Sequence, residues 1–139
     1  MDRFKFRVYN KNSNNYIKEK MFYINEFGGL FKYEQSKSTV YINAPSPCVM
    51  CFCGDNYIVE QCTGLKDING KLIYEGDILK DNHGRIARVY WSVTWCEFEV
   101  VYTHNNTGTI YSFTDWAYEK RCRTEIIGNI HENKDLLEE

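Results

Sequence analysis

Residues 72–91 read LIYEGDILKDNHGRIARVYW, and this stretch decides the fold class. Three short apolar segments, Leu72–Tyr74, Ile78–Lys80 and Arg85–Trp91, are separated by two polar segments that each contain glycine. Glu75-Gly76-Asp77 predicts a sharp bend, and Asp81-Asn82-His83-Gly84 predicts a tight turn, because glycine, aspartate and asparagine adopt turn conformations readily. The pattern therefore indicates consecutive antiparallel strands.

The same pattern continues on both sides of this stretch. Asn69-Gly70, a pair typical of two-residue hairpin turns, precedes it. The strands expected around it are Tyr57–Cys62, Cys96–Tyr102 and Thr109–Phe113. Short strands with turns every eight to twelve residues or so predict a small antiparallel barrel over residues 57–139, in an order similar to an SH3-like barrel.

Residues 1–56 predict a second β-rich region, a hairpin or small sheet packed with the barrel. The expected strands are Phe4–Tyr9, Tyr16–Ile24 and Thr39–Ile42, with a turn at Asn10–Asn15 and a loop or insertion over residues 43–56. Helices should be few and short. Candidates are residues 116–123, and a final turn at Lys134–Leu137 that Asn133 could cap.

Composition supports a mainly β fold. Val, Ile, Thr, Tyr, Phe and Trp together make up 50 of the 139 residues, whereas Ala, Leu and Met together make up 12. Branched and aromatic side chains lose rotamer freedom in helices but pack well on sheets.

Charge and hydropathy exclude several classes of protein. The formal net charge is −2, which argues against a strongly basic protein that wraps nucleic acid. The chain contains no long apolar run and no apolar signal core after Met1, so we expect a cytoplasmic protein without a membrane partner.

Three segments resemble the YopX-like family of phage and prophage proteins: residues 5–11 (KFRVYNK), residues 62–80 (CTGLKDINGKLIYEGDILK) and residues 125–137 (EIIGNIHENKDLL). The sequence departs from the family pattern at Val8-Tyr9, where a small residue and Trp are usual, and at Lys134, where proline is frequent. The resemblance implies a phage or prophage origin, a β-rich fold and an uncharacterised molecular role.

The middle segment also has a physical interpretation. Gly64, Gly70 and Gly76 recur every six residues, and Asp77 follows the last of them. Because glycine turns with positive φ at no steric cost, we interpret these residues as structural turns between short strands. A phosphate-binding loop is disfavoured, since no Lys-Ser or Lys-Thr pair follows the glycines.

The cysteines suggest one alternative site. Cys48, Cys51, Cys53 and Cys62 could supply four zinc ligands, but Val49, Met50 and Phe52 between them are typical of a strand and no second knuckle is present. Free thiols in a reducing compartment are the preferred interpretation, so no metal and no cofactor are expected.

No pattern for catalysis emerges. His83, His104 and His131 are not placed beside a nucleophile, and Glu97 and Glu99 indicate a solvated strand face. We therefore predict that the protein is not an enzyme.

Two binding hypotheses remain. The large aromatic content predicts exposed rings, and the first hypothesis is a self-associating module, a homo-oligomer that binds a host or phage protein. The alternative is a nucleic-acid or nucleotide-binding surface made of Arg85, Arg88, Tyr90, Trp91 and Trp95. These five residues also have a simpler structural interpretation, in which the aromatic side chains fill the core and the arginines pair with acidic residues.

Overall fold

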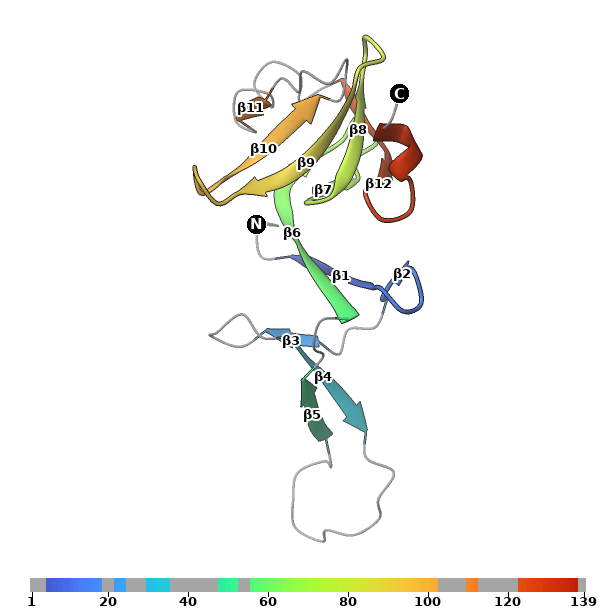
Figure 1. The fold of residues 1–139 in the computed structure, drawn as a ribbon, viewed down its shortest axis with the longest axis vertical. Coiled ribbons are helices and arrows are strands. Elements are labelled where there is room, and N and C mark those ends of the chain that lie inside the picture. The colour runs from blue at the N-terminus through green and yellow to red at the C-terminus, as the bar shows by residue number, and fades with distance from the viewer. Residues whose placement is uncertain are drawn as a thin grey trace, which may run out of the picture. The chain divides into compact units, whose positions relative to one another are not determined.

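The computed structural model describes residues 5–18, 22–24, 30–35, 48–52, 56–102, 110–112 and 123–137; at 22–24, 31–35 and 48–52 only the backbone is described. The described elements are nearly all strands, numbered β1 to β12, followed by the short 3-10 helix η3 (Lys134–Leu137) (Figure 1). The fold is mainly β, as the composition predicts.

The chain divides into two compact units. One consists of Met1–Arg7 together with Glu60–Glu139, and the other consists of Val8–Val59. The opening residues thus belong with the carboxy-terminal unit.

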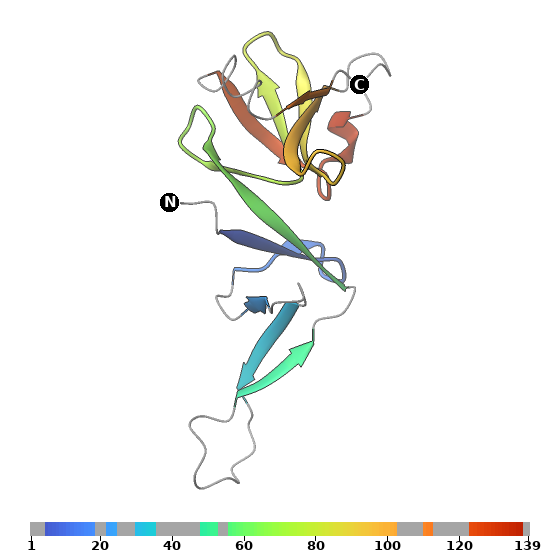
Figure 2. The same cartoon turned by 90° about the vertical axis from the view of Figure 1, so that its left-hand side faces the viewer.

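The larger unit contains a five-stranded antiparallel sheet in the order β11-β10-β9-β8-β12. The strands are β8 (Asp77–Asp81), β9 (Ile86–Ser92), β10 (Glu97–Tyr102), β11 (Ile110–Ser112) and β12 (Thr124–Asn129). The predicted pairing of β8 with β9 is confirmed, with Leu79 opposite Ala87. The sheet curls into a half-barrel, as Figure 2 shows, and the SH3-like detail stays a prediction.

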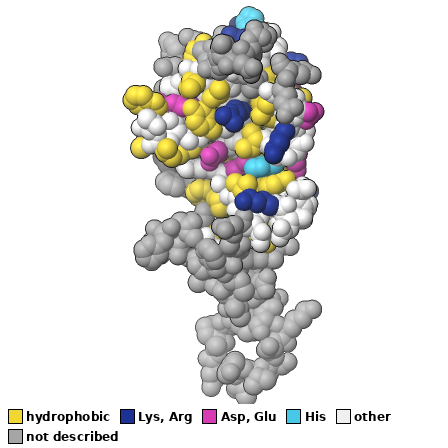
Figure 3. Space-filling model, viewed as in Figure 1, with side chains coloured by type: hydrophobic (Ala, Val, Ile, Leu, Met, Phe, Trp, Pro, Cys, Tyr) yellow, Lys and Arg dark blue, Asp and Glu magenta, His cyan; other side chains and the backbone are white. Residues whose placement is uncertain are grey.

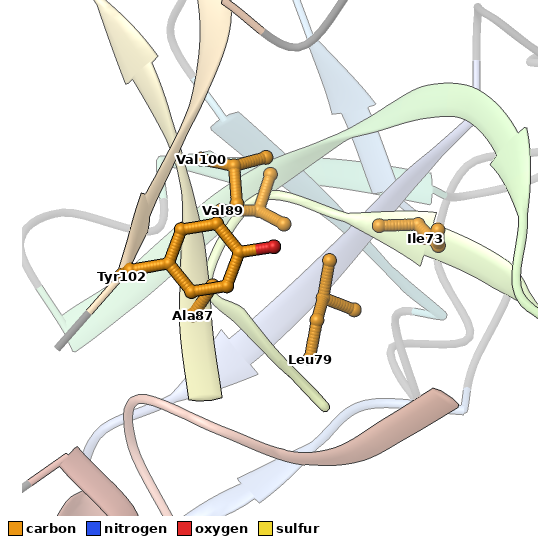
Figure 4. Close-up of a cluster of buried hydrophobic side chains, with 6 residues drawn as sticks. All are labelled: Ile73, Leu79, Ala87, Val89, Val100 and Tyr102. Carbon is orange, nitrogen blue, oxygen red and sulfur yellow. The ribbon is translucent and has the colours of Figure 1, made fainter. Parts of the chain in front are cut away.

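The core of this unit lies on the concave face of the sheet. Its buried members are Ile73, Leu79, Ala87, Val89, Val100 and Tyr102 (Figure 4). Alternate residues of β9 and β10 supply four of them, because side chains two apart on a strand share a face. Full burial of each Val, Leu or Ile contributes about 1.5–3 kcal/mol.

A second sheet has the order β2-β1-β6-β7. Its strands are β1 (Phe6–Asn10), β2 (Asn15–Tyr16), β6 (Tyr57–Lys66) and β7 (Leu72–Tyr74). The predicted opening hairpin is present, with Tyr9 opposite Tyr16 in register.

The glycines of the middle segment all have positive φ: +84° at Gly64, +79° at Gly70 and +79° at Gly76. Gly70 and Gly76 lie in turns. Gly64, however, lies inside β6 at an irregularity of register, not at a chain reversal as expected. Glycine nevertheless suits this position, because a residue with positive φ in a β-bulge is less strained when it has no side chain.

The smaller unit also contains a three-stranded sheet of β3 (Phe22–Ile24), β4 (Leu30–Gln35) and β5 (Cys48–Phe52). The expectation of a loop or insertion over residues 43–56 is therefore wrong for β5, which pairs with β4 in register. The strand expected at Thr39–Ile42 and residues 116–122 of an expected helix lie outside the described residues.

Candidate functional site

The turn between β9 and β10 exposes large apolar side chains. It is formed by Val93, Thr94, Trp95 and Cys96, and none of these is a residue type that favours turns. Val93 is 83% exposed and Trp95 is 71% exposed. In Figure 3, hydrophobic side chains protrude at the left edge of the molecule, where this turn lies.

The strands β9 and β10 anchor the base of this hairpin tip. Trp91 and Phe98 lie opposite each other in register, and their rings make an edge-to-face contact with centroids 5.0 Å apart. Phe98 in turn packs against the core cluster. The tip, defined as Trp91, Val93 and Trp95, is therefore anchored to the core at its base through Trp91 and Phe98.

The backbone conformation at the tip is also energetically unfavourable. Cys96 has a φ of +54°, a conformation that glycine or asparagine adopts at lower cost. The Cys96 thiol is exposed and donates a weak hydrogen bond to the Val93 carbonyl, with Sγ and O 3.8 Å apart. Polar turn residues would form this turn at lower cost, so the exposed apolar tip is the candidate interaction surface of the described residues.

The structure divides the predicted basic and aromatic set. Arg88 and Tyr90 alternate with the core residues of β9 and lie on the face opposite to Ala87 and Val89, whereas Trp91 continues the core face toward Phe98. The Arg88 guanidinium lies 5.8 Å from the centroid of the Tyr90 ring. These residues do not form one surface for stacking.

Arg85 pairs with an acidic residue of the adjacent turn. Its Nη2 and Nε lie 2.7 and 2.8 Å from Oδ2 of Asp81, and its guanidinium covers the ring of Tyr102 at 4.7 Å. Burial opposes ionisation of Asp81, but hydrogen bonds from the side chain and backbone of Arg85 and from the His83 N–H outweigh burial and lower its pKa. The same pairing raises the pKa of Arg85.

The expected solvated stripe on β10 is wrong at Glu99. This residue is only 5% exposed, and the Tyr90 hydroxyl donates a hydrogen bond to its carboxylate. Tyr90 lies directly across the strand pair, which provides the partner that a buried carboxylate requires.

A buried ionic network joins the opening strand to the rest of the larger unit. Arg7 Nε lies 2.6 Å from Oε2 of Glu60, and Arg7 Nη1 lies 2.6 Å from Oδ1 of Asp77. His131 Nε2 lies 2.8 Å from the other Glu60 oxygen. Glu60 and Asp77 are 2% and 1% exposed. Sequence reasoning missed this network, because its members are separated by tens of residues and only Asp77 was singled out, as a turn residue.

Burial and neighbouring groups shift the pKa values of the carboxyl groups in and beside this network. Burial raises the pKa of Asp77 against the opposing effects of Arg7 and of the Tyr74 N–H, which donates to Asp77 Oδ2 at 2.8 Å. Burial likewise raises the pKa of Glu75. Across the described residues, every buried side-chain nitrogen or oxygen has a hydrogen-bond partner. The carboxylates are thus engaged with the protein itself, an arrangement typical of a structural network.

The cysteine hypothesis is not decided by the described residues. Cys62 is buried in β6, and Cys48 and Cys51 lie in β5. Cys53 and the side chains of Cys48 and Cys51 lie outside the described residues, so neither the expected free thiols nor the alternative zinc site is tested there.

Comparisons with known proteins give a family and a fold. The family model described as YopX protein matches residues 5–138. The crystal structure of protein EF1440 from Enterococcus faecalis is similar over 96% of each chain, with a TM-score of 0.53 and 21% sequence identity, which supports the fold alone. No curated protein matches the chain. Separately, the described part of the chain holds no helix long and apolar enough to cross a membrane.

Proposed function

Since the chain belongs to the YopX family, for which the match names no activity, we propose from its own geometry that it is a non-enzymatic, self-associating protein-interaction module. The observation that carries the proposal is the hairpin tip of Trp91, Val93 and Trp95. An exposed tryptophan and valine at a turn cost solubility and give the isolated domain no packing in return.

Self-association is supported by the chemistry of the tip. Tryptophan is strongly enriched at the centres of protein interfaces, where it buries a large area with little loss of side-chain freedom. A second copy presents the same tip, so an isologous contact would bury apolar rings against apolar rings.

The non-enzymatic part of the proposal is supported by the buried acids. Glu60, Asp77, Asp81 and Glu99 all accept hydrogen bonds or ion pairs from this chain. A general acid or base needs an open side toward a substrate, and these four are committed to neighbours.

Sedimentation velocity over a wide range of protein concentration tests the proposal. The wild type should sediment as an oligomer that dissociates on dilution, and Val93→Ser with Trp95→Ser should sediment as a monomer throughout. Ile68→Ser is the matched control, because Ile68 is 61% exposed but lies in the turn before β7. A wild type that stays monomeric at high concentration, or an Ile68→Ser variant that dissociates like the tip variant, would contradict the proposal.

A further inference from the structure

The opening strand and the β6–β7 hairpin enclose a basic groove. Its volume is about 470 Å³, within the range of small-molecule sites. The lining residues are Lys5, Arg7, Lys66, Gly70, Lys71, Leu72 and Tyr74. Four cations thus line the groove, although Arg7 is paired with Glu60 and Asp77.

The β-sheet geometry explains this gathering. Lys5 directly precedes β1 and lies two residues before Arg7. Leu72 and Tyr74 are two residues apart on β7 and share a sheet face. The Cys62 N–H donates to the Lys5 carbonyl at 2.9 Å, and the Arg7 guanidinium lies 4.9 Å from the Tyr74 ring centroid. These contacts bring the opening residues alongside the hairpin.

The turn that bears the lysines is held in place before any ligand arrives. Asp67 Oδ1 accepts the N–H groups of Asn69 at 2.9 Å and Lys71 at 2.8 Å, and its Oδ2 accepts the Ile126 N–H at 3.3 Å. Lys66 and Lys71 flank this turn and are both exposed. Among the described residues neither lysine has a carboxylate partner, so their charges face the groove and solvent.

The rim of the groove is open at Gly70. A Cβ there would have no heavy atom within 4 Å, and the residue has a φ of +79°. The apolar part of the lining comes from Leu72 and from Tyr74, whose pKa is raised by burial and by Cys62 and lowered in part by Lys5 and Arg7. A groove with cations on one part and an apolar and aromatic part beside it suits a ligand that carries both phosphates and a ring.

We infer that this groove binds the phosphate groups of a nucleotide-type ligand, with Lys66 and Lys71 as the main phosphate contacts and Leu72 and Tyr74 against its apolar part. The inference rests on this groove alone and does not depend on the hairpin tip. The same chemistry is offered by a free nucleoside triphosphate and by a single nucleic-acid strand.

Fluorescence anisotropy at low salt, with a labelled adenosine triphosphate analogue and a labelled twelve-residue oligothymidine as separate probes, tests the inference. Lys66→Gln with Lys71→Gln should weaken binding by at least about tenfold. The control, Lys80→Gln with Lys134→Gln, makes the same change of charge at two exposed lysines outside the groove and should leave affinity within about twofold.

Each outcome decides the inference. Binding of the triphosphate that depends on the groove lysines supports it and identifies a free nucleotide as the source, and binding of the strand alone supports it and identifies nucleic acid. Absence of binding by both probes overturns it, and so does an equal loss in the two double variants, which would indicate unspecific attraction.

Discussion

Arg7 Nε lies 2.6 Å from Oε2 of Glu60, a carboxylate that is 2% exposed in the middle of β6. Together with Asp77, this pair places one partly buried cation between two buried anions. Such a network contributes little compared with apolar packing, but removal of one partner leaves uncompensated charge in a medium of low polarity.

Substitution of the cation is therefore expected to be costly. Arg7→Met keeps much of the side-chain volume but leaves Glu60 and Asp77 without their positively charged partner. We expect a loss of about 3–5 kcal/mol in the free energy of unfolding. Urea denaturation followed by tryptophan fluorescence measures this loss. Arg88→Met, at an exposed arginine on β9, should change stability by about 0.5 kcal/mol or less. Equal losses in the two variants would show that the buried network is not what Arg7 stabilises.

Gly76 and Gly84 provide a matched pair of substitutions. Their φ angles are +79° and +80°, so alanine meets the same backbone strain, about 1–2 kcal/mol, at either position. A Cβ at Gly84 has open space, but a Cβ at Gly76 would lie 2.4 Å from Glu60 Oε1.

Gly76→Ala should consequently displace Glu60 from Arg7 and His131. We expect it to cost about 2 kcal/mol more than Gly84→Ala, the scale of a lost hydrogen bond to a charged group. Thermal and urea unfolding of the two variants side by side measure the difference. Equal destabilisation would mean that Glu60 can move aside without losing its partners.

Asp81 predicts a pH dependence with a definite sign. Its pKa is lowered in the folded protein because Arg85 and two backbone N–H groups stabilise the ionised form. The stability it contributes is present above the ordinary aspartate pKa of about 3.9 and is lost as the pH falls through the lower pKa of the folded state.

Asp81→Asn should therefore be less stable than the wild type by about 1 kcal/mol at neutral pH, with the difference narrowing as the pH falls below about 4. Urea midpoints measured from neutral to acidic pH give the comparison. Asp135→Asn, at an exposed residue of η3, removes a carboxylate outside this turn and is the matched control. A gap between Asp81→Asn and the wild type that widens in acid would contradict the assigned direction.

The sequence predicted the elements whose determinants are local. The β8–β9 hairpin follows from apolar segments around the Asp81–Gly84 turn, and the opening hairpin follows from the asparagine-rich turn after Tyr9. The alternation of apolar and polar residues in a strand and the residue types of a turn both depend on a few neighbouring residues. They can therefore be interpreted without knowledge of the fold. The loop predicted where β5 lies is wrong because the determinant is not local. β5 forms by pairing with β4, a strand more than ten residues away in the sequence.

The charged sites could not be predicted in the same way. Arg7 and Glu60 are brought together by the neighbouring strands β1 and β6, and His131 reaches Glu60 from the turn after β12. Lys5, Lys66 and Lys71 likewise come together only in the folded chain. One local pattern pointed to a charged site. In Lys5-Phe6-Arg7 the two cations are two residues apart, the spacing that places side chains on one face of a strand. Which cation would be buried and which would line a groove depends on tertiary neighbours that a single sequence does not reveal.

The two cysteines with described side chains differ sharply in accessibility. Cys62 is 1% exposed inside β6, and the Gly64 N–H donates to its sulfur at 3.4 Å, whereas the Cys96 thiol lies exposed at the hairpin tip. Iodoacetamide should therefore alkylate Cys96 rapidly in the native protein and reach Cys62 only when the structure opens. Peptide mapping by mass spectrometry during a time course separates the two sites, and concentrated urea should make their rates similar. Comparable rates for both thiols in the native protein would mean that β6 is not protected as its burial requires.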